Sequence, residues 1–228
     1  MSEIYLNQIK KLKNSYKVSI RCDNDSFDFV ISDDLLIRLN FLKPKKLSDS
    51  EYKALLNSLP YDSIFLDGLK YATRKRRTIK EIKEHLREKT SSDELIQDVI
   101  NDLSKRNILN DEDYLNSYLE YAIYYKRDGY LKIVNDLMER GISKPFNYPI
   151  DQLKENIEVL TKKFVLSSKD MNKDLRIMKA KLYLKRRGYT DDDISKYFNS
   201  SLVSEGTGKK TDIRTKSITF RELKNKIK

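Results

Sequence analysis

The stretch Leu184–Ile194 reads LKRRGYTDDDI and has two earlier counterparts, LMERG at Leu137–Gly141 and LREK at Leu86–Lys89. The leading leucines of the three stretches lie 51 and 47 residues apart. Gly141 and Gly188 follow basic residues, which suit the negative end of a helix, and glycine readily takes the left-handed conformation that ends one. A period near 50 residues predicts tandem helical modules.

We therefore expect a mainly α protein of three tandem three-helix modules in a curved, elongated array, with a small N-terminal β-hairpin region. Modules that touch only their neighbours form a thin molecule, which accounts for 39% hydrophobic and 36% charged residues. The expected divisions are a hairpin with short helices at 1–60, helical repeats at 61–110, 111–152 and 153–199, and a basic tail at 200–228.

Local patterns support this division. Residues 16–31 alternate apolar and polar residues around the turn cluster Asp23–Ser26, which predicts the hairpin. Capping-box patterns at Thr78–Glu81 and Ser91–Glu94 predict two helix starts. Another helix should present a set of apolar side chains to the core, at helical spacing: Leu175, Met178 and Leu182.

The composition of the 228-residue chain favours a polyanionic partner and excludes several classes of protein. Lys and Arg number 46 against 35 Asp and Glu, a net charge of +11. The single cysteine, Cys22, and single histidine, His85, cannot form an internal disulfide or a Cys/His zinc cage.

No phosphate-binding glycine loop, no base and nucleophile pairing around His85 and no long apolar run is present in the sequence. No basic-then-apolar signal pattern begins it. We expect a cytoplasmic, monomeric protein that is not an enzyme and needs no cofactor or metal.

Several motifs in order resemble those of the RecX family. Arg74–Ile82 is similar to the family's R-x-R-S-x-x-E-[LV], and residues 99–114 to its V-x-x-L-x-x-x-x-[LY]-[LI]-[DN]-D-x-x-[FY]. Met138–Ile142 resembles L-x-x-K-G-[IV], and Lys185–Ile194 resembles L-x-R-[RK]-G-[FY]-[ST]-x-[DE]-x-I. The resemblance covers about residues 61–199; the prolines at 145 and 149 depart from the repeat.

The resemblance implies a regulator that binds the RecA recombinase, in the groove of its filament on single-stranded DNA. It implies inhibition or modulation of the recombinase, ATPase and coprotease activities of RecA in DNA repair, within homologous recombination and the SOS response. It also implies the curved array of three three-helix modules. Whether the protein caps, clamps or destabilises the filament is left open by these motifs.

Four basic clusters, within residues 43–46, 74–77, 126–127 and 185–187, recur at the expected module junctions, where a curved array could bring them onto one face. Any single cluster is as compatible with ordinary solvated surface as with a binding site. Most of the tyrosines and phenylalanines have the spacing of core residues. The candidates for RecA or DNA binding are Lys70, Arg74, Lys75, Arg76, Arg77, Tyr125, Lys126, Arg127, Tyr130, Lys179, Lys185, Arg186 and Arg187. The alternative function is DNA binding independent of RecA, through the basic surface and the tail.

Overall fold

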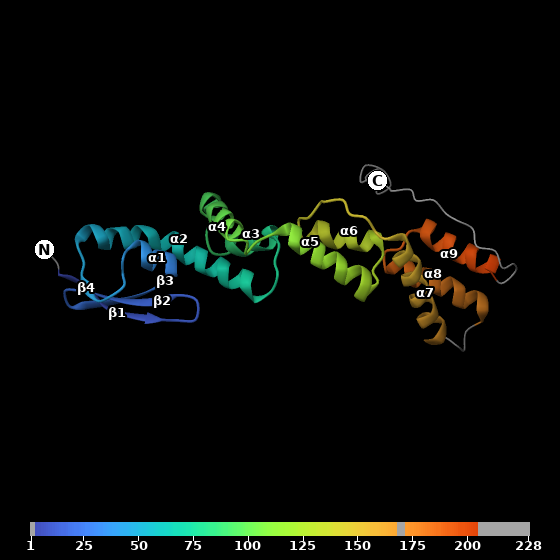
Figure 1. Cartoon of the computed structure of the whole chain (residues 1–228), viewed down its shortest axis with the longest axis horizontal. Helices are drawn as coiled ribbons and strands as arrows, with labels where there is room; N and C mark the ends of the chain where they lie inside the picture. The colour runs from blue at the N-terminus through green and yellow to red at the C-terminus, as the bar shows by residue number, and fades with distance from the viewer. Residues whose placement is uncertain (1–2, 168–171, 205–228) are drawn as a thin grey trace. The chain divides into compact units, whose positions relative to one another are not determined.

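The computed structural model in Figure 1 describes residues 3–167 and 172–204. Contacts between backbone segments divide the chain into two compact units, Met1–Asp111 and Glu112–Lys228. The described part is mainly helical with a small antiparallel sheet near the N-terminus, as predicted. The grouping of the helices into three repeated modules in a curved array remains a prediction. No described helix is both long and apolar enough to span a membrane.

The N-terminal unit begins with a four-stranded antiparallel sheet. Its strands are β1 (Ile4–Lys11), β2 (Tyr16–Cys22), β3 (Asp25–Ile31) and β4 (Lys45–Lys46), in the order β3-β2-β1-β4. The predicted hairpin is β2 and β3, whereas β1 and β4 were not predicted.

A register shift between Leu6 and Gln8 explains why β1 lacks the regular alternation of a predictable strand. The extra residue breaks the alternation of apolar and polar side chains on which a strand prediction rests. The two residues of β4 are too few to show any pattern. A hairpin alone was therefore too simple a description of the N-terminal region.

A single long helix, α2 (Asp49–Arg74), crosses the predicted boundary at residue 60. After α1 (Asp33–Arg38), α2 begins at a capping box of Ser48 and Glu51 and continues through Pro60. A proline inside a helix removes a hydrogen bond and kinks or breaks most helices. Here α2 supplies core residues on both sides of the proline, Leu55 to the sheet core and Phe65 to the next core, and we attribute its continuity to these contacts.

Two shorter helices complete the N-terminal unit, α3 (Ile79–Arg87) and α4 (Asp93–Lys105). Both contact the second half of α2. The capping box of Thr78 and Glu81 is confirmed, but the cap of α4 is Ser92, whose side chain accepts from the Leu95 amide, and not Ser91. Their shared core contains Ala72, Ile82, Leu86, Ile96, Val99, Ile100, Leu103 and Leu109, together with Phe65.

The C-terminal unit consists of helices. They are α5 (Asp111–Glu120), the π-helix η1 (Tyr121–Lys126), α6 (Tyr130–Glu139), α7 (Ile150–Ser167), α8 (Lys173–Arg186) and α9 (Asp191–Ser204). Gly141 and Gly188 have φ of 80° and 84°, as predicted for residues that follow helix ends. Since α9 continues to Ser204, the first residues assigned to the tail are helical, and residues 205–228 lie outside the described part.

One predicted core face is wrong. Leu175, Met178 and Leu182 of α8 are exposed, whereas Ala180 and Leu184 are buried. The helix has apolar side chains on more than one side, and their spacing cannot show which side meets α7 and α9.

Candidate functional site

Two of the predicted basic clusters meet in the C-terminal unit. The Arg187 guanidinium donates a hydrogen bond to the Lys126 carbonyl oxygen. The Gly129 amide donates to the Arg187 carbonyl oxygen at 2.7 Å, and the Leu131 amide to that of Gly188 at 3.0 Å. The loop after η1 is thus joined to the loop after α8. We name Lys126, Arg127, Lys185, Arg186 and Arg187 the cationic junction.

The backbone at the end of η1 is unusual. Arg127 adopts a left-handed conformation with φ of 55°, which costs a non-glycine residue about 1–2 kcal/mol. The Tyr189 hydroxyl donates to the Arg127 carbonyl oxygen at 2.9 Å and holds this turn. Short π-helical segments frequently occur at functional sites. The chain therefore maintains a strained turn where two of its basic residues lie.

A buried carboxylate organises the junction from within. The Asp128 side chain is only 1% exposed and lies 2.8 Å from the Lys132 ammonium and 3.2 Å from the Arg187 guanidinium. A buried charge needs such partners because it has lost its hydration. Arg187 is therefore occupied by the fold, on Asp128 and on the Lys126 carbonyl.

The remaining cations of the junction are more open to solvent. Lys126, Lys185 and Arg186 are exposed, and Arg127 is partly buried. Lys185 forms a 2.8 Å ion pair with Asp191, but both side chains are at least half exposed, and such pairs contribute little to stability. The exposed cations therefore extend into water from backbone segments whose positions are fixed.

Two glycines allow the loops to approach each other. A Cβ atom on Gly129 would lie 2.3 Å from the carbonyl carbon of Gly188. A Cβ atom on Gly188 would lie 2.4 Å from the Lys132 amide nitrogen, and its φ of +84° also disfavours any side chain. No residue larger than glycine fits at either position without moving the loops apart.

Exposed tyrosines extend the junction along η1. Tyr121, Tyr124 and Tyr125 are 51%, 46% and 69% exposed. The rings of Tyr121 and Tyr125 stack with centroids 6.3 Å apart, and the Lys126 ammonium lies 5.3 Å from the Tyr121 ring centroid. Tyr121 was not among the predicted candidates, although its position four residues before Tyr125 on a helix was a usable signal.

Tyr130, by contrast, is not part of this exposed surface. It is half-buried, with its ring centroid 4.9 Å from that of Phe146. Burial raises the pKa of its hydroxyl. Of the two tyrosines that we predicted as contacts, Tyr125 therefore faces solvent and Tyr130 packs inside the unit.

The third predicted cluster lies in the N-terminal unit, at the end of α2. Lys70, Arg74, Lys75 and Arg76 are exposed. Arg77 is different, because its guanidinium lies 4.2 Å from the Tyr71 ring centroid and 3.1 Å from the Glu81 carboxylate. Its side chain is 15% exposed. Arg77, the last arginine of this cluster, is therefore held by contacts within the fold, as Arg187 is in the cationic junction.

The other predicted positions are scattered. Lys179 is exposed on α8. Of the cluster at 43–46, Lys45 pairs with Glu51 at 2.7 Å and Lys46 forms an exposed pair with Glu3 at 2.8 Å, both within the N-terminal unit. Within residues 3–167 and 172–204, no three His, Cys, Asp or Glu side chains gather in a way that could hold a metal ion. The chemistry that the junction offers is recognition of anions.

Comparisons with known proteins agree on one family name. No family model matches the sequence. The chain is 30% identical over 203 residues to "Regulatory protein RecX" of Clostridium botulinum (strain Alaska E43 / Type E3), which covers 85% of this chain and 93% of that protein. It is 23% identical over 213 residues to "Regulatory protein RecX" of Oceanobacillus iheyensis, covering 90% and 78% of the two chains.

Solved structures share the fold. "Crystal structure of regulatory protein RecX" aligns with a TM-score of 0.63 at 18% identity, over 87% of this chain and 100% of that one. "Crystal structure of RecX from Lactobacillus salivarius" aligns with a TM-score of 0.55 at 21% identity, over 63% and 97%.

Proposed function

Since the chain belongs to the RecX family of regulatory proteins, we propose that it binds the RecA recombinase on single-stranded DNA and restrains it. The restrained activities are strand exchange, ATP hydrolysis and coprotease activity. The protein itself acts as a monomeric cytoplasmic regulator and catalyses no reaction. The observation that supports a direct role for this chain's own residues is the cationic junction.

The junction suits a polyanionic partner because its cations stand on backbone that is fixed before binding. Lys126 and Arg186 come from segments about 60 residues apart and are brought together by Gly129, Gly188 and the buried Asp128. Side chains on a preformed backbone lose less entropy on binding than those on a loose loop. In this proposal Lys126, Lys185 and Arg186 contact DNA phosphates or acidic groups of RecA within the filament groove.

The exposed tyrosines support the same assignment. Proteins that bind single strands combine a cationic track for the backbone with aromatic rings on which bases stack. Tyr121 and Tyr125 lie directly beside Lys126 and supply such rings. The exposed cations Lys70 and Arg74–Arg76 provide a second cationic contact from the N-terminal unit, and Lys179 a further one on α8.

The decisive experiment measures DNA-dependent ATP hydrolysis and strand exchange by cognate RecA. We expect the intact chain to inhibit both. The triple variant Lys126→Ala, Lys185→Ala, Arg186→Ala should need about tenfold more protein for half-inhibition. A matched triple variant elsewhere, Lys53→Ala, Lys154→Ala, Lys163→Ala, removes the same charge from exposed positions and should inhibit almost normally.

Two results would count against the proposal. If a stoichiometric excess of the intact chain leaves both RecA activities unchanged, the chain is not a RecA regulator. If the two triple variants lose inhibition equally, total charge matters and the junction does not.

The second candidate function is DNA binding without RecA, which the same exposed lysines, arginine and tyrosines favour. Gel shifts on naked single-stranded and duplex DNA distinguish the two functions. Three phosphate contacts to a single strand give a slope of about −2 for log affinity against log salt. Tight binding to naked DNA that disappears when residues 205–228 are removed would favour this second function over the first.

A further inference from the structure

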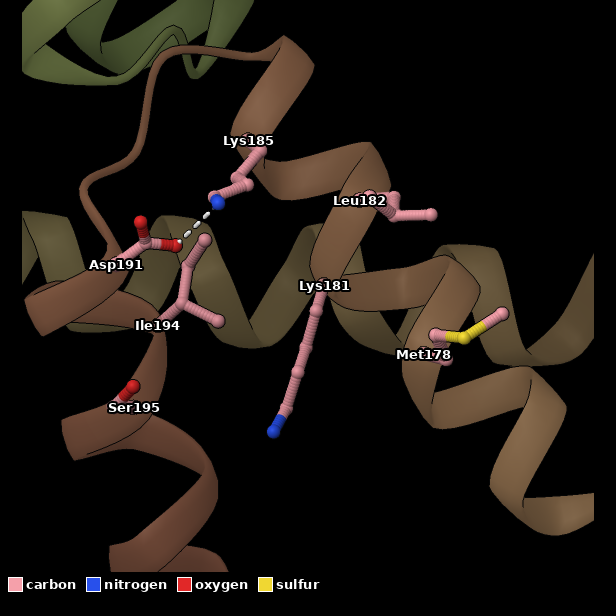
Figure 2. A pocket seen from close by; sticks show the side chains of 7 residues that line it. All are labelled: Met178, Lys181, Leu182, Lys185, Asp191, Ile194 and Ser195. Atoms are coloured by element: carbon pink, nitrogen blue, oxygen red, sulfur yellow. Dashed lines mark ion pairs between the residues drawn. The ribbon is translucent and has the colours of Figure 1, made fainter.

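A stripe of exposed apolar side chains follows one side of α8. Leu175, Met178 and Leu182 are 41%, 53% and 44% exposed. They occupy positions i, i+3 and i+7, which lie on one face of a helix. Figure 2 shows the Met178 and Leu182 side chains extending in the same direction from the helix.

The stripe borders a hollow between α8 and α9, drawn in Figure 2. Ile194 of α9 lies in it and is 3% exposed, so the hollow has an apolar floor. The residues that line it are Met178, Lys181, Leu182, Lys185, Asp191, Ile194 and Ser195. We name this hollow and the adjoining stripe the α8–α9 groove.

The walls of the groove are helices that pack against neighbouring helices. On the side of α8 away from the stripe, Ala180 and Leu184 are 1% and 0% exposed. The three helices α7, α8 and α9 contact one another. Large apolar side chains on such a fixed helix lose little freedom when a partner covers them, which favours binding.

The α8 side of the groove is positively charged, whereas α9 begins with three aspartates, Asp191–Asp193. Within α8 the sequence places one carboxylate, Asp174, among several cations: Lys173, Arg176, Lys179, Lys181, Lys185 and Arg186. The Asp191 carboxylate at the rim is 2.8 Å from the Lys185 ammonium. The Lys181 ammonium lies 5.2 Å from the Phe198 ring centroid.

This charge selects among the possible occupants. A second copy of the chain would bring the cations of α8 against the same cations. The chain's own residues 205–228 contain eight Lys and Arg and only three Asp and Glu, so they are repelled as well. An acidic segment with apolar residues on one side can cover the apolar stripe and also pair with the cations beside it.

We propose that the α8–α9 groove docks an acidic amphipathic helix of a partner protein. Positions 175 to 182 span two helical turns, or about 10 Å. The occupant is therefore a helix of two to three turns, with apolar anchors at spacings of three and four and acidic residues beside them. This inference stands whether or not RecA is the partner, because it rests on α8 and α9 alone.

The test uses a synthetic probe in place of the unidentified partner. The probe is a 16-residue acidic peptide with leucines at positions i, i+3 and i+7 and one tryptophan next to them. Because the chain contains no tryptophan, fluorescence from the peptide alone reports binding. We expect a saturable blue shift when the full chain is added, and a much weaker one with a scrambled peptide of the same composition.

The decisive variant is Met178→Lys, Leu182→Lys. It adds two positive charges, so attraction by charge alone would tighten peptide binding, whereas loss of the apolar contact should weaken it at least tenfold. Ile37→Lys, Leu42→Lys is the matched control, because both of these side chains are 67% exposed in the N-terminal unit. The control should bind the peptide as the unmodified chain does.

Three outcomes would overturn the proposal. Equal binding of the scrambled peptide, or undiminished binding by Met178→Lys, Leu182→Lys, would show that charge alone attracts the peptide. Sedimentation that finds a dimer disrupted by the same substitutions would identify a second copy as the occupant. Tighter peptide binding after removal of residues 205–228 would identify this chain's own C-terminal segment. Each outcome is independent of the RecA assay.

Discussion

Each unit contains two neighbouring hydrophobic cores, and the units differ in how these two cores are joined. In the N-terminal unit one continuous helix, α2, contributes Leu55 to the sheet core and Phe65 to the helical core. In the C-terminal unit the core of α5–α6 meets that of α7–α9 at two loops that touch at Gly129 and Gly188, and where α7 contacts η1, with the Asn156 amide donating to the Ile123 carbonyl oxygen at 2.8 Å. The first connection spreads over many apolar contacts, whereas the second depends on a few small and polar groups. The second should therefore be the more sensitive to single substitutions.

The largest expected effect is at the glycines. Gly129→Ala places a Cβ atom against the Gly188 backbone, so we expect about 3 kcal/mol or more of destabilisation. The matched change in the N-terminal unit is Gly68→Ala, where the new Cβ would meet side chains of α4 at an ordinary 3.4 Å. Alanine also favours a helix interior by up to about 1 kcal/mol. Urea unfolding followed by circular dichroism compares the two, and equal losses would contradict the comparison.

A smaller difference in the free energy of unfolding is expected between variants of Arg187 and Arg77, the two arginines held by contacts within the fold. Arg187→Met leaves the buried Asp128 with Lys132 as its remaining charged partner, and we expect a loss of about 3 kcal/mol. Arg77→Met removes a partly exposed pair with Glu81 and a stack on Tyr71, which should cost about 1 kcal/mol. The free energies of unfolding of the two variants test this order. The reverse order would mean that Asp128 does not organise the junction.

Asp62 offers a way to weaken the N-terminal connection. Its buried carboxylate on α2 accepts hydrogen bonds from the amide, at 2.7 Å, and the hydroxyl of Ser32, which caps α1. Asp62→Ala leaves both donors without this acceptor and should cost about 2 kcal/mol. The check is the urea midpoint of the N-terminal unit. A neutral result would show that apolar contacts along α2 are sufficient by themselves.

The smallest effect concerns the beginning of α2. Hydrogen bonds from Lys45 and from the Ser48 amide lower the pKa of Glu51 to about 2, from an ordinary 4.5. A lowered pKa in the folded state stabilises the fold above pH 4.5, and this contribution is lost as the pH falls towards 2. Glu51→Gln should reduce stability near neutral pH by less than about 1 kcal/mol and flatten the acid dependence. Urea midpoints at pH 6, 4 and 3 test it, and parallel curves for both proteins would refute it.

Features that depend on near neighbours were predictable. The cap at Thr78 and the left-handed glycines 141 and 188 follow from residues within one or two helical turns. The ordered motifs also identified the family correctly. Where a pattern was interrupted, as by the bulge in β1, or was too short, as in β4, the prediction failed.

The candidate site was predictable only in part. The basic clusters are visible in the sequence, yet nothing local separates Arg186, which is exposed, from Arg187, which contacts Asp128. The same holds for Tyr125 and Tyr130. In each case the neighbour that matters lies far along the chain or on another helix.

The composition, the helix ends and the order of the motifs were thus sufficient to show from sequence that the protein is basic, mainly helical and a member of the RecX family. These properties arise from residues close together in the chain. The tertiary structure settled which side of α8 is buried, which arginines the fold occupies and where two clusters meet. The meeting of the two clusters depends on close approach between segments about 60 residues apart, at Gly129 and Gly188. Such contacts are determined by shape and burial, which the spacing of residues along a chain does not reveal.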